Sequence, residues 1–359
     1  MIRTNNSVGI IPIFVSHMGC PNACTFCNQR KISGVEDAIK PEALIKHVEM
    51  YLKTMKRDRI ELAFFGGSFT GIATLLQERY LNYAKQLKDS GMIDAIRLST
   101  RPDYVDDVVV ERLLKYNVDL VELGCQSFDE TVLVASKRGH DQQAIYRAVR
   151  LLKAASIDVG IQLMLGLPFD TYEKFMASVE ATISLDPACV RLYPALVIKD
   201  TELFDQFEMG VFSPLSVDDA VDWCADAMKR FNKAKIHVIR IGLQPTDVIN
   251  FEGSVVAGPF HPAFGERVMS RLHLRALEKF FIKLSTEKGW HEHEPIGIVV
   301  NEKQLSAVKG NRRLNEQLLN ALIFPYGNGQ VSISGDQATE TDHATVFIGN
   351  RAYKVNIMS

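Results

Sequence analysis

The sequence predicts an α/β fold in which a partial (β/α)6 barrel is followed by a small C-terminal α+β domain. From residue 9 to about residue 193, short apolar runs rich in β-branched residues alternate with segments of helical periodicity, the pattern of a parallel sheet with crossover helices. Beyond a glycine- and proline-rich passage at residues 253–265, a long amphipathic helix and a closing β-meander replace this alternation. We therefore expect a barrel domain over residues 1–250 and an appended domain over residues 251–359.

Six strands are expected in the first domain, and an open doubly wound sheet is the alternative to a barrel. The strands are Gly9–Val15, Ile60–Phe65, Ile96–Ser99, Val118–Leu123, Asp158–Leu165 and Cys189–Tyr193. Helices are expected from Pro41 onward, where a proline suits a first helical turn, and at Ile72–Ser90, Val105–Lys115, Gln142–Ala155 and Tyr172–Leu185.

The remaining elements follow the same signals. After Ser213 the periodicity predicts a helix through Lys233 and then a short strand at Val238–Ile241. In the appended domain we expect helices at Pro262–Ser285 and Leu314–Leu322, a strand at Ile296–Val300, and a hairpin of Thr345–Ile348 and Ala352–Ile357 across Gly349-Asn350.

Composition excludes several classes of protein. Hydrophobic residues make up 47% of the 359 residues and charged residues 23%, which excludes a disordered chain. The formal net charge is −2, so a purely electrostatic nucleic-acid binder is not expected. No stretch approaches the roughly 18 to 20 uninterrupted apolar residues that span a bilayer. These features predict a cytoplasmic protein without a membrane partner.

Three of the cysteines are crowded into one segment, Cys20, Cys24 and Cys27, at C-x3-C-x2-C spacing after the first strand. Three thiolates on one tight loop can hold zinc or an iron–sulfur cluster. A structural zinc site normally has four ligands, so a trio favours a metal centre with an open position. Chance crowding of buried cysteines and a zinc site completed by His17 are the alternatives.

This cysteine motif, with the aromatic Phe26 directly before Cys27, resembles the signature of the radical S-adenosylmethionine (SAM) superfamily. The resemblance implies a partial radical SAM barrel in which Cys20, Cys24 and Cys27 bind a [4Fe-4S] cluster and SAM chelates the fourth iron. It further implies reductive cleavage of SAM to a 5'-deoxyadenosyl radical, which abstracts hydrogen from a substrate. A flavodoxin or a ferredoxin is the electron donor that such chemistry implies.

A glycine pair at the end of the second strand supports the resemblance. Gly66-Gly67-Ser68 resembles the Gly-Gly-Glu turn whose backbone holds the amino group of SAM in that superfamily, with Ser68 in place of the glutamate. Two glycines allow a ligand to approach the main chain closely. A plain strand-to-helix turn is the alternative interpretation.

Four further segments resemble one branch of the superfamily, the catalytic subunit of the Elongator complex, which modifies the wobble uridine of tRNA. They are Ser99–Tyr104, Val121–Ser127, Lys137–His140 and Arg191–Lys199, within a similarity from about His17 to Leu215. No acetyl-CoA-binding turn follows Asn250, so the branch's acetyltransferase domain is not expected here. The substrate implied is a tRNA nucleoside or, failing that, a small molecule.

The residues expected to bind the cofactor lie at or just after the C-terminal ends of the predicted strands, where α/β barrels build their sites. Arg101 and Arg191 could meet a carboxylate or phosphate, and ion pairs are their alternative role. The full set is Phe26, Gly66, Gly67, Ser68, Thr100, Arg101, Gln126, Ser127, Gln162 and Arg191. Cys125 lies at the same edge, where a hydrogen-atom donor is possible and a buried small residue is favoured.

Basic residues recur at every fourth position of the long helix, in the row Arg267, Arg271, Arg275, Lys279 and Lys283. Such a row is either a contact for RNA phosphates or the solvated flank of an amphipathic helix. Lys309, Arg312 and Arg313 form a second candidate contact, and Arg240–Thr246 with Gly258–Arg267 either face a ligand or form a domain junction. The competing function is a non-catalytic RNA-binding module stabilised by zinc or by a cluster.

Overall fold

The computed structural model describes residues 8–15, 18–20, 24–28, 38–243, 249–286, 295–323 and 330–359. His17 and Gln244–Thr246, named above as candidates, lie outside these ranges. The chain divides into two compact units. One contains Met1–Ser216 and Ile236–Phe260, and the other contains Val217–Lys235 and His261–Ser359, so the units divide differently from the expected boundary at residue 250.

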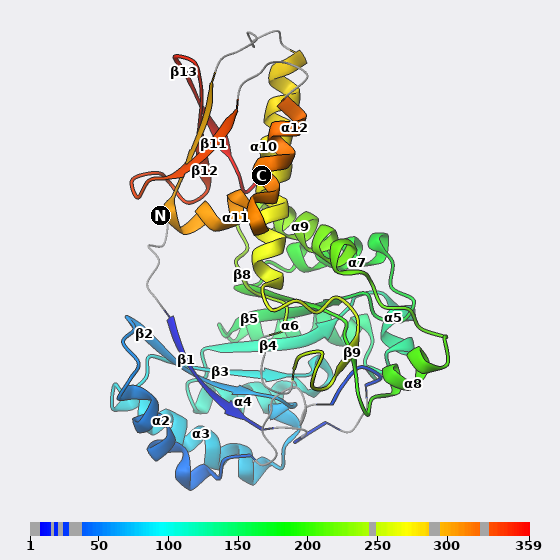
Figure 1. Ribbon diagram of the computed structural model, residues 1–359. Helices are drawn as coiled ribbons and strands as arrows, with labels where there is room; N and C mark the ends of the chain where they lie inside the picture. The colour runs from blue at the N-terminus through cyan, green and yellow to red at the C-terminus, as the bar shows by residue number, and fades with distance from the viewer. Residues whose placement is uncertain are drawn as a thin grey trace. The chain divides into compact units, whose positions relative to one another are not determined.

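The first unit is built on a curled, seven-stranded parallel sheet, which confirms the predicted α/β half-barrel (Figure 1). The strand order is β1-β2-β3-β4-β5-β6-β8, and each neighbouring pair is parallel. The bounds are β1 Val8–Phe14, β2 Arg59–Phe65, β3 Ala95–Thr100, β4 Leu120–Gln126, β5 Asp158–Leu165, β6 Cys189–Pro194 and β8 Val238–Ile241. Because all these strands run the same way, their C-terminal ends meet at one edge of the sheet.

Helices follow the strands, and side-chain caps fix where several of them begin. They are α2 Leu44–Leu52 after the 3-10 turn η1 Pro41–Ala43, α3 Thr74–Asp89, α4 Asp107–Lys115, α6 Gln142–Ala154 and α7 Tyr172–Ser184. Asp106 accepts a hydrogen bond from the Val109 N–H, so α4 begins two residues later than its periodicity predicts. Asp141 and Thr171 cap α6 and α7 in the same way.

Short elements of the first unit escaped prediction. They are the helices α5 Glu130–Ala135 and α8 Glu202–Glu208 and the antiparallel pair β7 Val197–Ile198 and β9 Val255–Ala257. Each is too short for a hydrophobic period to show in the sequence. Both helices are capped, α5 by the Asp129 carboxylate and α8 by the Thr201 hydroxyl.

The second unit is the predicted small α+β domain together with α9 Val217–Lys233. Its sheet has the order β11-β10-β12-β13 and combines parallel and antiparallel pairs. The strands are β10 Ile296–Val300, β11 Val331–Gly335, β12 His343–Ile348 and β13 Arg351–Asn356, and the helices are α10 Phe264–Thr286, α11 Leu305–Lys309 and α12 Leu314–Ile323. Strand β11 and helix α11 were not predicted.

The basic row on α10 faces an acidic row on α9 within this unit. Arg267 pairs with Asp218 at 3.1 Å, and Arg275 pairs with Asp226 at 2.9 Å. Arg271 pairs with Asp222 between them. Residues four apart on each helix lie on one side, so the two rows meet as a ladder. These three guanidinium groups are therefore paired within the fold, although each stays about a third exposed.

His273 on α10 is fully buried, and neither ring nitrogen has a hydrogen-bond partner among the described residues. Burial lowers the pKa of this imidazole to about 4. In the unfolded chain this imidazole is protonated as the pH falls below about 6.5, whereas in the folded chain it stays neutral down to about pH 4. The free energy of unfolding therefore decreases as the pH falls through this window.

We expect His273→Leu to remove this loss. At pH 5 the histidine should cost the wild type about 2 kcal/mol relative to pH 8, and the variant should lack this component. Urea unfolding at both pH values measures it. The exposed His237, replaced by glutamine, is the control. Equal pH dependence in wild type and His273→Leu would contradict the prediction.

Candidate cofactor site

The loop that carries the cysteines is hydrogen-bonded to the loop that follows β2. The Val15 N–H donates to the Phe65 carbonyl at 2.7 Å, which extends the β1–β2 pairing to the end of both strands. The Met18 N–H then turns back to the Val15 carbonyl at 3.0 Å, and the Ser68 N–H donates to the Met18 carbonyl at 3.0 Å. The first cysteine, Cys20, is thereby positioned beside the glycine turn.

The glycines of that turn are needed for two different reasons. Gly66 has a φ of +87°, in the left-handed region that favours glycine. At Gly67 a Cβ would lie 2.5 Å from the Val15 carbonyl oxygen and 2.7 Å from that of Met18. The space left by the missing side chain at Gly67 is therefore filled by the backbone of the cysteine loop. Ligand approach at this pair remains a prediction, whereas the contact between the two loops is observed.

Hydroxyl groups join the loops that follow β2 and β3. The fully buried Ser68 shares a hydrogen bond of 2.9 Å with the Thr100 hydroxyl and accepts one of 3.3 Å from the Arg101 N–H. Thr100 also bonds the hydroxyl of Thr70 at 2.6 Å. Ser68 therefore occupies the glutamate position of the motif as a buried structural hydroxyl, and Thr100 shares that role.

The other end of the cysteine loop is held by the two helices that were not predicted. The Thr25 N–H donates to the Ser136 carbonyl at the end of α5, and the Leu203 N–H of α8 donates to the Thr25 carbonyl at 2.7 Å. Cys24 and Phe26 are buried in an apolar cluster with side chains from both helices. Its members are Cys24, Phe26, Val132, Leu167, Ala195, Val197, Leu203 and Phe212, and Cys27 packs against it.

Two buried arginines lie beside the thiols. Arg138 donates through Nη1 to the Cys24 sulfur at 3.1 Å, and Arg101 makes a two-pronged pair with Asp103 at 3.0 and 2.8 Å. Burial and the neighbouring Cys24 thiol raise the pKa of Cys20, and both arginines oppose that shift. The two cations reduce this shift without reversing it, so the pKa of Cys20 stays above its ordinary value. Arg138 was not among the predicted site residues.

The three thiols are spaced too widely to close around a single tetrahedral metal ion. A tetrahedral zinc with bonds of about 2.3 Å would hold its sulfur ligands about 3.8 Å apart. Within the described part of the chain, the sulfur atoms of Cys20, Cys24 and Cys27 do not all lie within 4.8 Å of one another. In an iron–sulfur cluster each cysteine binds a different iron, so the thiols sit farther apart. The trio is therefore not closed around a single zinc ion, and three thiols are the donor set that a [4Fe-4S] cluster with one open iron takes.

At the end of β4, Gln126 and Ser127 have different environments. Gln126 has a φ of +70° next to a register shift in β4, and its buried Oε1 has no hydrogen-bond partner among the described residues. Its strained backbone and unpartnered buried oxygen leave the Gln126 side chain able to accept a further hydrogen bond. Ser127 instead accepts from the Asp129 N–H at 3.1 Å and lies 3.4 Å from the Ser178 hydroxyl of α7. Ser127 is therefore tied to the helices.

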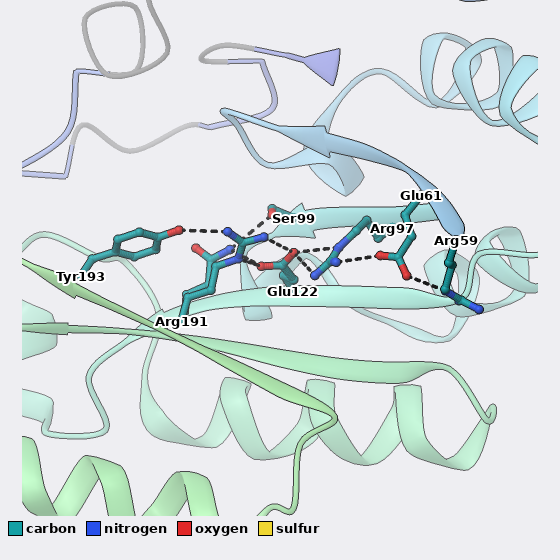
Figure 2. A network of polar contacts seen from close by, with 8 residues as sticks. Arg59, Glu61, Arg97, Ser99, Glu122, Arg191 and Tyr193 are labelled. Carbon is teal, nitrogen blue, oxygen red and sulfur yellow. Dashed lines mark hydrogen bonds and ion pairs between the residues drawn. The ribbon is translucent and has the colours of Figure 1, made fainter. Parts of the chain in front are cut away.

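A buried carboxylate organises the inside of the sheet (Figure 2). Glu122 on β4 is 1% exposed and accepts from Arg97 at 2.6 and 3.0 Å and from Arg191 at 3.1 Å. Gln162 donates to Glu122 at 3.2 Å and to Ser99 at 3.3 Å. Burial alone would raise the pKa of Glu122, but Arg191 and Arg97 hold it below the usual range. Both predicted ligand contacts, Arg191 and Gln162, are thus engaged by this carboxylate.

The remaining charges of the Arg191 network extend across the strands. Glu61 on β2 pairs with Arg97 at 2.8 Å and with Arg59 at 2.9 Å. At the other end, Arg191 lies 5.2 Å from the Phe65 ring centroid and donates to the Tyr193 hydroxyl at 3.4 Å. The pKa of Arg191 is raised even though burial opposes this, because Tyr193 and Glu122 are adjacent. A chain of alternating charges therefore crosses the interior face from β2 to β6.

The segment after α5, residues 137–140, has an inner side that faces the cysteine loop and an outer side that faces away from it. Arg138 points inward to Cys24, whereas Lys137 pairs with Glu202 at 2.6 Å on the outer side. Lys137, Asp103 and His140 line an open cleft of about 830 Å³ there. Burial and the nearby Arg138 lower the pKa of His140 to about 4. The cleft is thus lined by a neutral imidazole and by charges that already have partners.

The other three cysteines lie in the core. Cys125 and Cys224 are fully buried and Cys189 is 6% exposed. Burial raises the pKa of Cys125 to about 12 and that of Cys189 to about 11. The burial of Cys125 agrees with the interpretation that the sequence favoured, a buried small residue.

Comparison with known proteins matches this architecture to one superfamily. The protein-family model described as "Radical SAM superfamily" matches residues 15–182, and the family model described as "Radical_SAM C-terminal domain" matches residues 187–273. The described residues contain no helix with the length and apolarity needed to cross a membrane.

Curated relatives carry names from tRNA modification. A tRNA uridine(34) acetyltransferase of Methanocaldococcus infernus is 27% identical over 263 residues, covering 62% of this chain and 49% of the relative. Elongator complex protein 3 of Danio rerio is 25% identical over 276 residues, with the same two shares. The chain spans about half the length of these relatives.

A solved structure supports the fold. The archaeal Methanocaldococcus infernus Elp3, with an N-terminal deletion, superposes with a TM-score of 0.61 at 23% identity, over 76% of this chain and 64% of that one. At this identity the superposition establishes the fold alone. With the two matching models extending from residue 15 to residue 273, the chain belongs to the radical SAM superfamily.

Proposed function

We propose that this chain is a radical SAM enzyme in which Cys20, Cys24 and Cys27 hold a [4Fe-4S] cluster that binds SAM. The observation that carries the proposal is the placement of Cys20 and Cys24 beside the buried cations Arg101 and Arg138, at the edge where the parallel strands end. A guanidinium beside the sulfur atoms, such as that of Arg138 at 3.1 Å from the Cys24 sulfur, offsets the negative charge of cysteine ligands once they bind iron. When bound and reduced, the cluster supplies the electron that cleaves SAM to methionine and a 5'-deoxyadenosyl radical.

The chain's own residues would bind and orient the cofactor. The buried, unpartnered Oε1 of Gln126 is placed to accept a hydrogen bond from the ribose or from the methionine end of SAM. The glycine turn at Gly66-Gly67 and the hydroxyls of Ser68 and Thr100 hold the loops in place, while Phe26 and its apolar cluster exclude water from one side of the thiols. Gln162 and Arg191 would act through the Glu122 network.

For the substrate we propose a nucleoside of tRNA, with a small molecule as the alternative. The proposal rests on the names of relatives such as tRNA uridine(34) acetyltransferase, which match 62% of this chain. The chemistry is hydrogen abstraction from that nucleoside. The electron donor would be a flavodoxin or a ferredoxin, and the reduced thiols favour a cytoplasmic location.

Anaerobic reconstitution with iron and sulfide tests the proposal. The wild type should bind about four irons per chain and, after reduction with SAM present, release 5'-deoxyadenosine, with tRNA added in parallel reactions. Cys24→Ala should retain less than half of the iron and release no nucleoside. Cys189→Ala, which changes a buried cysteine outside the loop, should behave as the wild type.

Two outcomes would contradict the proposal. Iron near zero in the reconstituted wild type would exclude the cluster. About one zinc per chain, with RNA affinity that falls steeply as salt rises, would support the non-catalytic RNA-binding module instead.

A further inference from the structure

We propose that Arg138 raises the reduction potential of the cluster by donating a hydrogen bond to the sulfur of Cys24. This inference rests on the proposed function and assigns a positioning residue that the cysteine motif does not contain. Arg138 is separated from Cys24 by 114 positions in the sequence, yet its Nη1 lies 3.1 Å from that sulfur.

The Arg138 side chain is held at several points, which fixes the direction of its hydrogen bond. Its Nη2 donates to the Gly124 carbonyl at the end of β4, and its Cζ lies 6.0 Å from the centroid of the Phe26 ring. The side chain is only 6% exposed. A planar guanidinium can meet a sulfur, a carbonyl and a ring face at once, and a lysine ammonium cannot.

The backbone around Arg138 accounts for its inward direction. The Arg138 N–H closes the turn after α5 by donating to the Leu133 carbonyl at 3.0 Å. Both neighbours are in the left-handed region, Lys137 at a φ of +51° and Gly139 at +72°. With Lys137 paired to Glu202 at 2.6 Å on the outer side, the loop separates an inner cation from an outer one.

The electrostatic consequence follows from the charge of the cluster. One-electron reduction adds a negative charge to a group whose sulfur ligand already accepts a hydrogen bond from a buried cation. Arg138 therefore stabilises the reduced form more than the oxidised form, and the potential becomes less negative. Hydrogen bonds to the sulfur atoms are an established means of setting such potentials. The electron comes from an external one-electron donor, for which dithionite serves in the test.

The test is a reductive titration of the reconstituted full chain, followed by electron paramagnetic resonance. Relative to the wild type, Arg138→Gln should shift the midpoint potential to a more negative value. Arg138→Lys keeps the charge without the planar fork and should fall between the two. Lys137→Gln, on the same loop but paired outward, is the matched control and should leave the potential unchanged. Iron content is measured on every sample.

A second measurement separates potential from structure. With a reductant poised near the wild-type midpoint, Arg138→Gln should release 5'-deoxyadenosine several-fold more slowly than the wild type, whereas a strong reductant should largely restore the rate.

Three results would be decisive against the inference or its basis. Identical potentials in wild type and Arg138→Gln at equal iron content would overturn it. Loss of iron in both Arg138 variants would also overturn it, because Arg138 would then support the loop rather than tune the cluster. If the wild type itself forms no cluster, it is the proposed function that fails.

Discussion

Replacing Gly67 with alanine should remove most of the iron that the chain can bind, although Gly67 carries no ligand atom. The new Cβ would lie 2.5 Å from the Val15 carbonyl oxygen and 2.7 Å from that of Met18. Both contacts are with backbone, so no side-chain rotation relieves them and the chain before Cys20 must move. Because Ser68 and Met18 are joined by a backbone hydrogen bond, the displacement breaks the alignment of the two loops.

Iron per chain after anaerobic reconstitution is the measurement for Gly67→Ala. We expect less than a quarter of the wild-type value, with far-ultraviolet circular dichroism close to that of the wild type because the sheet is not touched. Gly297→Ala is the matched control, since its Cβ would meet only the Phe347 side chain, at 3.8 Å. Full iron content in Gly67→Ala would show that the loops do not meet as closely as described.

The same contact illustrates how far the sequence alone could lead. The Gly66-Gly67 pair was predicted as a place where a ligand approaches the main chain, and two glycines do signal a close approach. Which group approaches is a property of the fold. Here the backbone of the preceding loop makes the approach, and no local pattern in the sequence distinguishes this from a ligand.

The strands and cysteines were predictable because their signals are local. All six predicted strands are present, and the predicted short strand at Val238–Ile241 is the seventh member of the sheet, paired with β6. By contrast, the helices α5 and α8 span 6 and 7 residues, too short to show a period, although they hold Thr25 of the cysteine loop. Their caps, Asp129 and Thr201, were the only local signal.

Pairings between distant residues could not be predicted. Arg191 was predicted to meet a ligand or to form an ion pair, and its ion-pair partner, Glu122, lies 69 positions away. The arginine row on α10 was open to RNA until its acidic counterpart on α9 was known. The charge of a side chain shows which groups it can bind, and only the fold determines which of those groups lies beside it.

Glu122→Gln should be the most destabilising of the substitutions considered. It removes one negative charge from a site that is 1% exposed, which leaves Arg191 without a counter-ion among the described residues and Arg97 with Glu61 alone. Breaking a buried pair by removing one partner typically costs about 3 to 5 kcal/mol, because the remaining charge is buried without compensation. Two cations depend on this carboxylate, so we expect a loss in the upper part of that range.

The comparison with a surface pair makes the result interpretable. Glu78 lies 3.2 Å from Lys115, whose side chain is 62% exposed, and Glu78→Gln should change the free energy of unfolding by less than about 0.5 kcal/mol. Urea unfolding at pH 7 measures both variants.

The pH dependence of the difference in free energy of unfolding then shows whether the Glu122 charge causes the destabilisation. Because the pKa of Glu122 is held below its usual range, its contribution is fully present at neutral pH and is lost only as the pH falls through that lowered value. The gap between wild type and Glu122→Gln should therefore stay constant from pH 8 to pH 5 and narrow below that. A gap under about 1 kcal/mol at pH 7 would mean that the existing contacts of Arg97 with Glu61 and of Arg191 with Tyr193 are enough to compensate both cations.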